Sequence, residues 1–159
     1  MQQKTIIRVA VPEDAGLVLQ FIRELAEYEH LLETVFITQE ILYEWISSHR
    51  VEVLLAEYDG EAVGFALYYF TYSTFRGQSG IYIEDLFVRP QFRGLGIGTR
   101  FFYELAKIAR LRGCFRLDWM VLDWNINSIA FYKKLGGHPV ENWTTFRLDG
   151  EPLKLLAEK

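Results

Sequence analysis

Residues 85–98 form the stretch of this sequence with the most evident chemistry, a glycine-rich loop that reads Asp-Leu-Phe-Val-Arg-Pro-Gln-Phe-Arg-Gly-Leu-Gly-Ile-Gly. Gly94, Gly96 and Gly98 alternate with larger residues, and glycine lets a backbone approach a ligand closely and adopt positive φ. The loop leads into a predicted helix, whose first N–H groups can bind an anion. With the cation of Arg93 beside them, these features predict a diphosphate site.

Two other glycine-rich motifs fit this loop poorly. A P-loop reads Gly-x-x-x-x-Gly-Lys-Ser/Thr, and no lysine follows these glycines. A dinucleotide fingerprint reads Gly-x-Gly-x-x-Gly near the first strand of a βαβ unit, whereas the spacing here is Gly-x-Gly-x-Gly. A glycine-rich turn without a ligand is the remaining alternative, and three alternating glycines directly after an arginine argue against it.

Residues 123–137 are the second candidate stretch. Asn125 is placed where a helix N-cap is expected. Ile129, Tyr132 and Lys133 then share one helix face, so Tyr132 could point toward the diphosphate site. A tyrosine hydroxyl can give a proton to a leaving thiolate. A half-buried core aromatic is the other interpretation of a single tyrosine.

Carboxylates gather along the first predicted helix and just after it, at Glu24, Glu27, Glu29 and Glu33. They are either a solvated helix face or a funnel for a cationic substrate. The histidines, by contrast, are scattered and form no cluster with cysteine, so the sequence predicts no metal site. Cys114 is interpreted as a small packing residue.

Predicted strands and helices along the chain position these residues. Helices are expected at 14–29, 38–47 (capped by Thr38), 98–112 and 126–135, from apolar residues at helical spacing. Strands are expected at 5–11, 51–58, 62–72, 81–88, 115–122 and 143–148, with Asp59-Gly60 as a hairpin turn. The order β-α-α-β-β-β-α-β-α-β predicts one α/β domain spanning residues 1–159.

Composition narrows the function classes. Of the 159 residues, 50% are hydrophobic, and the net charge of −4 disfavours a nucleic-acid partner. One cysteine allows no internal disulfide, which fits a reducing compartment. The first residues lack the apolar core of a signal peptide, and no apolar run approaches the 18 or so residues of a membrane span. We therefore expect a cytoplasmic protein without a membrane partner.

The two chemistry-bearing stretches together resemble the GNAT superfamily of N-acetyltransferases. Arg93, Gly96 and Gly98 match its acetyl-CoA motif, Arg/Gln-x-x-Gly-x-Gly/Ala. Residues 125–136 match its Asn-x-x-Ala/Ser-x-x-Phe-Tyr-x-Lys-x-Gly segment, in the right order and at the right separation.

Longer segments resemble the diamine (spermidine/spermine) N-acetyltransferases, a subfamily that also acts on thialysine and related amino acids. These segments are residues 23–29, 63–72 and 82–88, and the similarity runs from Ile7 to about Leu155. The resemblance implies the GNAT fold, in which helices flank a mixed, mostly antiparallel central sheet. It also implies a homodimer that uses acetyl-CoA as co-substrate and no metal, while leaving polyamines and thialysine-like amino acids undistinguished.

The resemblance assigns roles residue by residue. Coenzyme contacts would come from Leu86, Phe87, Val88, Arg93, Gly94, Leu95, Gly96, Ile97, Gly98, Thr99, Asn125 and Ser128. Amine contacts would come from Tyr28, Glu29, Glu84, Asp85 and Glu141. The segment 136–143 is shorter here than in the animal diamine enzymes. Glu84 would accept the amine proton, directly or through water, and Tyr132 would be the general acid.

The implied reaction is direct acetyl transfer to the primary amine of a small cation in a ternary complex. At neutral pH such an amine is mostly ammonium, so a base is needed. A backbone N–H near residues 86–88 would hold the carbonyl oxygen. Two alternatives stay open: acetylation of a protein or peptide, and a non-catalytic acyl-CoA-binding regulatory domain.

Overall fold

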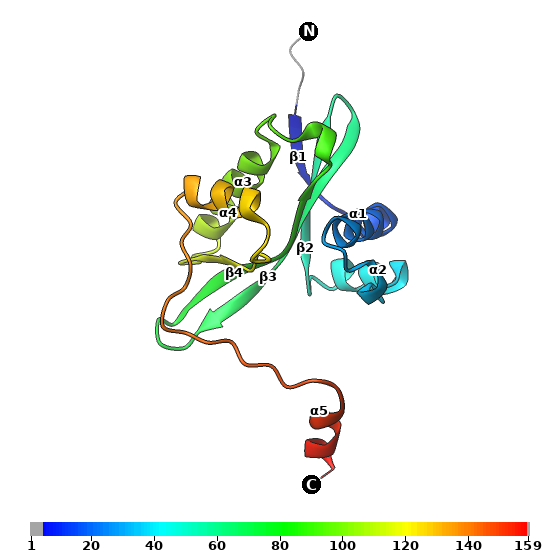
Figure 1. The fold of residues 1–159 in the computed structure, drawn as a ribbon. Coiled ribbons are helices and arrows are strands. Elements are labelled where there is room, and N and C mark those ends of the chain that lie inside the picture. The colour runs from blue at the N-terminus through cyan, green and yellow to red at the C-terminus, as the bar shows by residue number, and fades with distance from the viewer. Residues whose placement is uncertain (1–4, 159) are drawn as a thin grey trace. The chain divides into compact units, whose positions relative to one another are not determined.

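A computed structural model describes residues 5–158, in which helices flank a five-stranded sheet (Figure 1). The chain divides into two compact units, with the boundary between Met120 and Val121. The first unit holds the whole sheet, in the order β1-β2-β3-β4-β5. Its strands are β1 (Thr5–Val9), β2 (Glu52–Tyr58), β3 (Glu61–Ser73), β4 (Gln78–Val88) and β5 (Leu117–Trp119).

Hairpins explain why the sheet is mostly antiparallel. Asp59 and Gly60 both have positive φ, 49° and 84°, as a tight turn between β2 and β3 requires. β4 and β5 pair in parallel because the helix α3 (Ile97–Leu111) connects them. The expected mixed, mostly antiparallel sheet is confirmed.

Helices cover both faces of this sheet. α1 (Ala15–Tyr28) and α2 (Gln39–Ser47) pack on one face and α3 on the other (Figure 1). The ring of Phe21 stacks 5.7 Å from Phe65 in the core between α1 and the sheet. Thr38 caps α2 as expected, with its Oγ1 accepting from the Ile41 amide at 3.3 Å.

A β-bulge interrupts β4 where the candidate carboxylates lie. Leu67 of β3 pairs with Asp85, but its neighbour Tyr68 pairs with Ile83, so Glu84 is an extra residue. The parallel pairing with β5 ends at the same place, with Ile83 opposite Trp119. Among the described residues, the part of β4 after Ile83 pairs with β3 but no longer with β5, so it forms an edge of the sheet.

The second unit corrects two expectations. It contains α4 (Ile126–Lys134), as expected, and α5 (Gly150–Ala157), which was not. Residues 143–148 were expected to be a strand but, in the described part of the chain, they pair with no other strand, and their side chains are exposed. Aromatic and β-branched residues, which strands favour, are frequent there, but a strand also needs a partner for its backbone groups. In the first unit, β5 is also shorter than the expected 115–122.

Candidate active site

The glycine loop enters α3 in a conformation that suits an anion. Gly94 and Gly96 both have φ of 79°, and a Cβ at either position would meet no atom within 4 Å. Gly96 is the N-cap of α3, and the first intrahelical bond joins the Arg100 amide to the Gly96 carbonyl at 3.0 Å. The amides of Ile97, Gly98 and Thr99 are therefore those that a helix start leaves without intrahelical partners. They can bind phosphate oxygens.

Arg93 connects this loop to α1. Its Nε donates to the Val88 carbonyl at 2.9 Å, and its guanidinium carbon lies 4.5 Å from the ring centre of Tyr28. The Phe87 ring lies 5.7 Å away. In this structure the Arg93 side chain is thus directed at the helix that carries an expected amine contact.

The last residues of β4 present backbone groups to the side that β5 has left. The Arg89 amide donates to the Val63 carbonyl of β3. Backbone N–H and C=O groups point to opposite sides in successive strand residues, so those of Leu86 and Val88 point away from β3. Phe87 instead buries its side chain in the core against α1. Leu86 and Val88 are therefore the strand residues able to pair with an extended ligand.

Three carboxylates lie at the bulge and at the end of α1. Glu84 is exposed, Asp85 is half-buried, and Glu29 is the C-cap residue of α1. Burial, then the negative charges of Glu84 and Glu29, raise the pKa of Asp85 to about 7. Burial also raises the pKa of Glu29. Binding either a proton or a cation would therefore relieve the repulsion among these carboxylates.

Two tyrosines that the sequence motifs did not single out, Tyr69 of β3 and Tyr82 of β4, join the site. The Tyr69 hydroxyl donates to Oε2 of Glu84 at 3.2 Å, and its ring stacks 5.3 Å from Tyr82. Burial and the charge of Glu84 raise the pKa of Tyr69 to about 12, so it stays a donor. Tyr69 pairs with Tyr82, so Glu84 is its diagonal neighbour across the strands, and this register could not be read from the sequence pattern.

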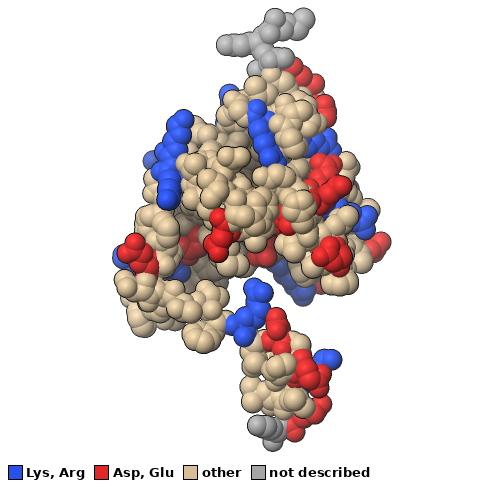
Figure 2. Space-filling view, viewed as in Figure 1, with Lys and Arg blue, Asp and Glu red and all other residues tan. Residues whose placement is uncertain are grey.

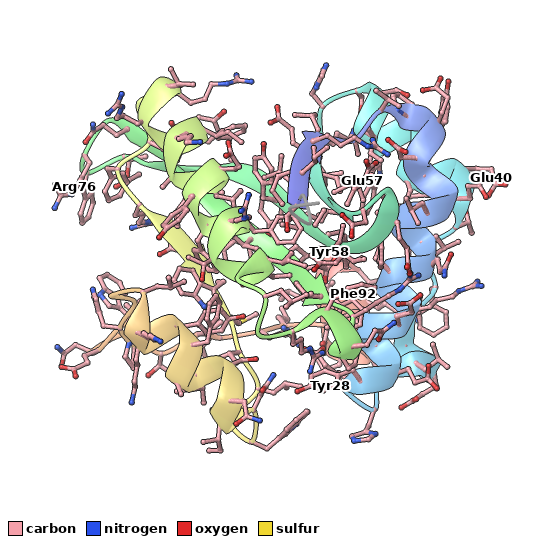
Figure 3. The ribbon with its side chains drawn as sticks, turned by 90° about the horizontal axis from the view of Figure 1, so that it is seen from above. Tyr28, Glu40, Glu57, Tyr58, Arg76 and Phe92 are labelled. Carbon is pink, nitrogen blue, oxygen red and sulfur yellow. The ribbon has the colours of Figure 1, made fainter. Side chains whose placement is uncertain are left out.

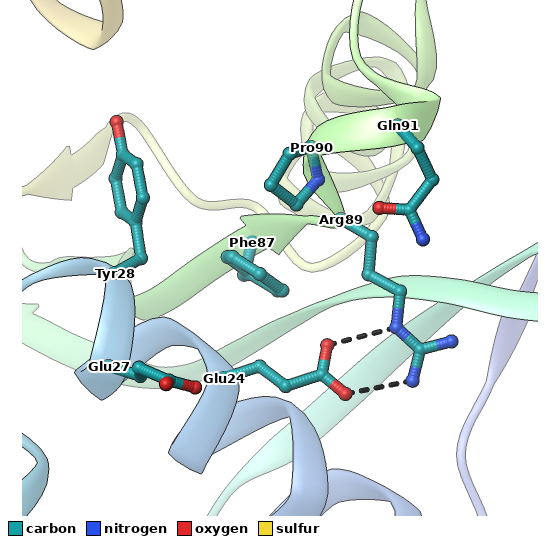
Figure 4. Close-up of a pocket in the computed structure, with 7 residues that line it drawn as sticks. All are labelled: Glu24, Glu27, Tyr28, Phe87, Arg89, Pro90 and Gln91. Atoms are coloured by element: carbon teal, nitrogen blue, oxygen red, sulfur yellow. Dashed lines mark hydrogen bonds and ion pairs between the residues drawn. The ribbon is translucent and has the colours of Figure 1, made fainter.

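A cavity of about 350 Å³ lies on the α1 side of β4. Figure 4 shows its lining residues: Glu24, Glu27, Tyr28, Phe87, Arg89, Pro90 and Gln91. Glu24 accepts two hydrogen bonds from Arg89, at 2.9 and 2.8 Å. Seen from above, Phe92 lies beside Tyr58 of β2 (Figure 3), with the two ring centres 5.6 Å apart. The acidic helix face is therefore partly structural, since Glu24 serves an ion pair, while Glu29 faces the carboxylates of β4.

The remaining expected site residues belong to the second unit. Asn125 is buried, and its Oδ1 accepts from the Ser128 amide at 3.3 Å, so the asparagine caps α4 as expected. Tyr132 is half-buried on α4, with the Phe131 ring 5.4 Å away. Glu141 is exposed in the segment after α4. The roles given to these four residues remain predictions.

Blue and red side chains are intermixed on the visible face of residues 5–120 (Figure 2). Among residues 5–158, no three His, Cys, Asp or Glu side chains are grouped to hold a metal ion. Within the same range, every helix is too short or too polar to cross a bilayer.

This chain is similar in sequence to known acetyltransferases. Residues 19–137 match the profile of the acetyltransferase (GNAT) family. The thialysine N-epsilon-acetyltransferase of Bos taurus is 40% identical, with 97% of this chain and 98% of that protein aligned. The spermidine/spermine N(1)-acetyltransferase-like protein 1 of Homo sapiens is 33% identical over 95% of this chain and 23% of its own length.

A solved structure supports the same assignment. An integron cassette protein from the mobile metagenome of V. cholerae superposes with a TM-score of 0.80 at 26% identity, with 98% of each chain covered. The expected fold and enzyme class are confirmed by these matches together. The chain belongs to the acetyltransferase (GNAT) family, and it is an acyltransferase.

Proposed function

We propose that this protein transfers the acetyl group of acetyl-CoA to a primary amine of a small cation while both are bound. The observation that carries the proposal is the position of β4 between two kinds of site. Its last residues lead into the loop and amides at the start of α3, which suit a diphosphate. On its α1 side, Asp85 and Glu29 suit an ammonium group.

The residues present fit the coenzyme. Open space at Gly94 and Gly96 leaves room for a diphosphate against the backbone, and the amides of residues 97–99 would bind its oxygens. The backbone groups of Leu86 and Val88 would pair with the extended pantetheine arm. Because Arg93 bonds the Val88 carbonyl here, its guanidinium would exchange that bond when the arm pairs.

The carboxylates would bind the amine as its ammonium form, since an alkyl amine has a pKa near 10. One of them would take its proton, and an N–H of residues 86–88 would stabilise the carbonyl oxygen. Tyr132 would supply the proton that the departing thiolate needs. Holding two substrates in line can lower the barrier by up to about 7–11 kcal/mol in ideal cases.

We further propose a thialysine-like amino acid as the preferred substrate, with diamines second. The 40% identity to the bovine thialysine enzyme over nearly the full chain supports this order, and the weaker match to the spermidine/spermine-like protein supports diamines.

The single cysteine, Cys114, is compatible with a cytoplasmic location, which fractionation of cells carrying the tagged protein would test.

Thiol release from acetyl-CoA tests the function directly, with thialysine, lysine, spermidine, putrescine, diaminopropane and short peptides as acceptors. We expect turnover with thialysine or a diamine and little with peptides. Tyr132→Phe should lower kcat at least tenfold with unchanged acetyl-CoA affinity, while Tyr103→Phe, on the exposed face of α3, serves as the matched control. Turnover of peptides alone, or coenzyme binding without any turnover, would refute the proposal.

A further inference from the structure

Glu84 and Asp85 are adjacent carboxylates in different surroundings. Glu84 is the extra residue of the bulge, is exposed, and has one oxygen engaged by the Tyr69 hydroxyl at 3.2 Å. Asp85 is back in regular pairing, opposite Leu67, and is half-buried. Two neighbouring acids whose environments differ in this way take different roles in proton transfer.

The face on which Asp85 lies follows from the strand period. Side chains two residues apart share a face, and both Phe87 and the cross-strand partner Leu67 belong to the core beneath α1. Asp85 therefore faces α1, whose last turn leads to Glu29. Glu84 thus lies toward solvent at the strand edge, and Asp85 lies between the sheet and the helix.

Negative charge acts on Asp85 from both elements that pack around it. Glu84 contributes from β4 and Glu29 from α1. The tyrosines of the sheet face, Tyr69 and Tyr82, are neutral, because their pKa values are raised by burial and by Glu84. The guanidinium of Arg93 is engaged by the Val88 carbonyl and stacked on Tyr28. An ionised Asp85 therefore faces two like charges and is a strong proton acceptor for a carboxylate.

We infer that Asp85, rather than Glu84, accepts the proton of the substrate ammonium, and that Glu84 is a positioning residue held by Tyr69. This inference rests on the proposed function, acetyl transfer to a small amine. A base works best when its pKa lies near the operating pH, and the value of about 7 for Asp85 meets that condition.

The proton balance of the reaction is complete with the residues named. The ammonium gives one proton to the Asp85 carboxylate, and the neutral nitrogen then attacks the thioester carbon. A C–N bond forms, the C–S bond breaks, and the nitrogen loses a second proton to solvent. The thiolate takes one proton from Tyr132, which solvent restores, and Asp85 releases its proton to solvent after product leaves.

The pH dependence of kcat/KM with the best amine of the panel tests the assignment. We expect Asp85→Asn to lower kcat/KM at neutral pH at least 100-fold, as loss of a general base does, and to remove the acidic limb near pH 7. Glu84→Gln should keep plateau turnover within about tenfold. It should move the acidic limb down by up to about one pH unit, because it removes a negative neighbour of Asp85. Glu104→Gln, an exposed carboxylate paired with Lys107 on α3, is the matched control and should leave the profile unchanged.

A titration without turnover keeps the inference testable if a variant is inactive. The Asp85 carboxyl carbon, assigned by its absence from Asp85→Asn, should titrate near pH 7 by NMR and at lower pH in Glu84→Gln. A loss of 100-fold or more in Glu84→Gln would overturn the inference whatever Asp85→Asn does, and so would an Asp85 titration below pH 5. Either result leaves wild-type amine turnover, and with it the proposed function, intact.

Discussion

At the scale of single residues, burial and position decide what each acidic group can do. Glu24 of α1 accepts two hydrogen bonds from Arg89, whereas Asp85 of β4 has like charges as neighbours. The pairing with Arg89 lowers the pKa of Glu24, and burial raises that of Asp85. One carboxylate is therefore structural, and the other is available for chemistry.

The raised pKa of Asp85 predicts that its ionised form destabilises the folded protein. Its native state favours the protonated form, so the stability that this form contributes is present at low pH and is lost as the pH rises from about 4 through about 7. We expect Asp85→Asn to be more stable than the wild type at pH 8 by about 1–3 kcal/mol and nearly equal to it at pH 4. Urea unfolding at both pH values measures this. An equal effect at the two pH values would contradict it.

Gly96 allows a prediction that separates strain from binding. Its φ of 79° makes Gly96→Ala cost about 1–2 kcal/mol in unfolding free energy, although no atom would contact the new Cβ. The added methyl group would enter the space beside the amides of α3, so acetyl-CoA affinity should also fall at least tenfold by calorimetry.

Gly113, with φ of 68° and equal open space after the C-terminus of α3, is the control for this change. Gly113→Ala should cost similar stability and leave acetyl-CoA affinity unchanged. Equal affinities for both variants would show that the loop does not hold the coenzyme.

At the scale of elements, Arg89 joins the end of β4 to α1. It makes a two-bond ion pair with Glu24, bonds Glu61 and the Ala62 carbonyl, and lies 5.0 Å over the Phe21 ring. Its side chain is 17% exposed. The ion pair therefore fixes the helix that carries Tyr28 and Glu29 against the strand that carries Asp85.

Loss of this contact should be costly. We expect Arg89→Ala to lower the free energy of unfolding by about 2–4 kcal/mol, since it leaves Glu24 as a partly buried, uncompensated charge. Arg112→Ala, which removes a 59%-exposed partner of Glu52, should cost less than about 1 kcal/mol. Denaturant titration of both variants measures these losses. Equal losses of unfolding free energy would show that the Arg89–Glu24 ion pair does not stabilise the fold.

The sequence predicted most elements and the glycine-rich turn into α3, because these depend on local signals. Positive-φ glycines, the Thr38 cap and the hairpin at Asp59-Gly60 each act over a few residues. The bulge, the partner of Tyr69 and the unpaired segment 143–148 depend on which strands meet and in what register. Such long-range pairing is not contained in a local pattern, so those features could only be found in the fold.

At the scale of the whole molecule, the homodimer stays a prediction with a simple measurement. The second unit exposes Trp143 by 80% and Phe146 by 90%, and apolar surface of this kind often marks an interface. Light scattering should give about twice the chain mass of 18.6 kDa. The double variant Trp143→Ser, Phe146→Ser should lower that mass, whereas Leu111→Ser, on α3, should not. A wild-type mass of one chain at all concentrations would refute the dimer.

The bulge also suggests how such a sheet could lose a positioning residue without losing its shape. Because Glu84 is the residue by which β4 exceeds β3, its deletion would make the pairs Leu67–Asp85 and Tyr68–Ile83 adjacent rungs of an uninterrupted ladder. Every other residue of β4 would keep its cross-strand neighbour and its face. A single lost codon could therefore leave a well-formed sheet that keeps Asp85 and lacks the contact between Glu84 and Tyr69, an evolutionary route to an enzyme with a shifted pH profile.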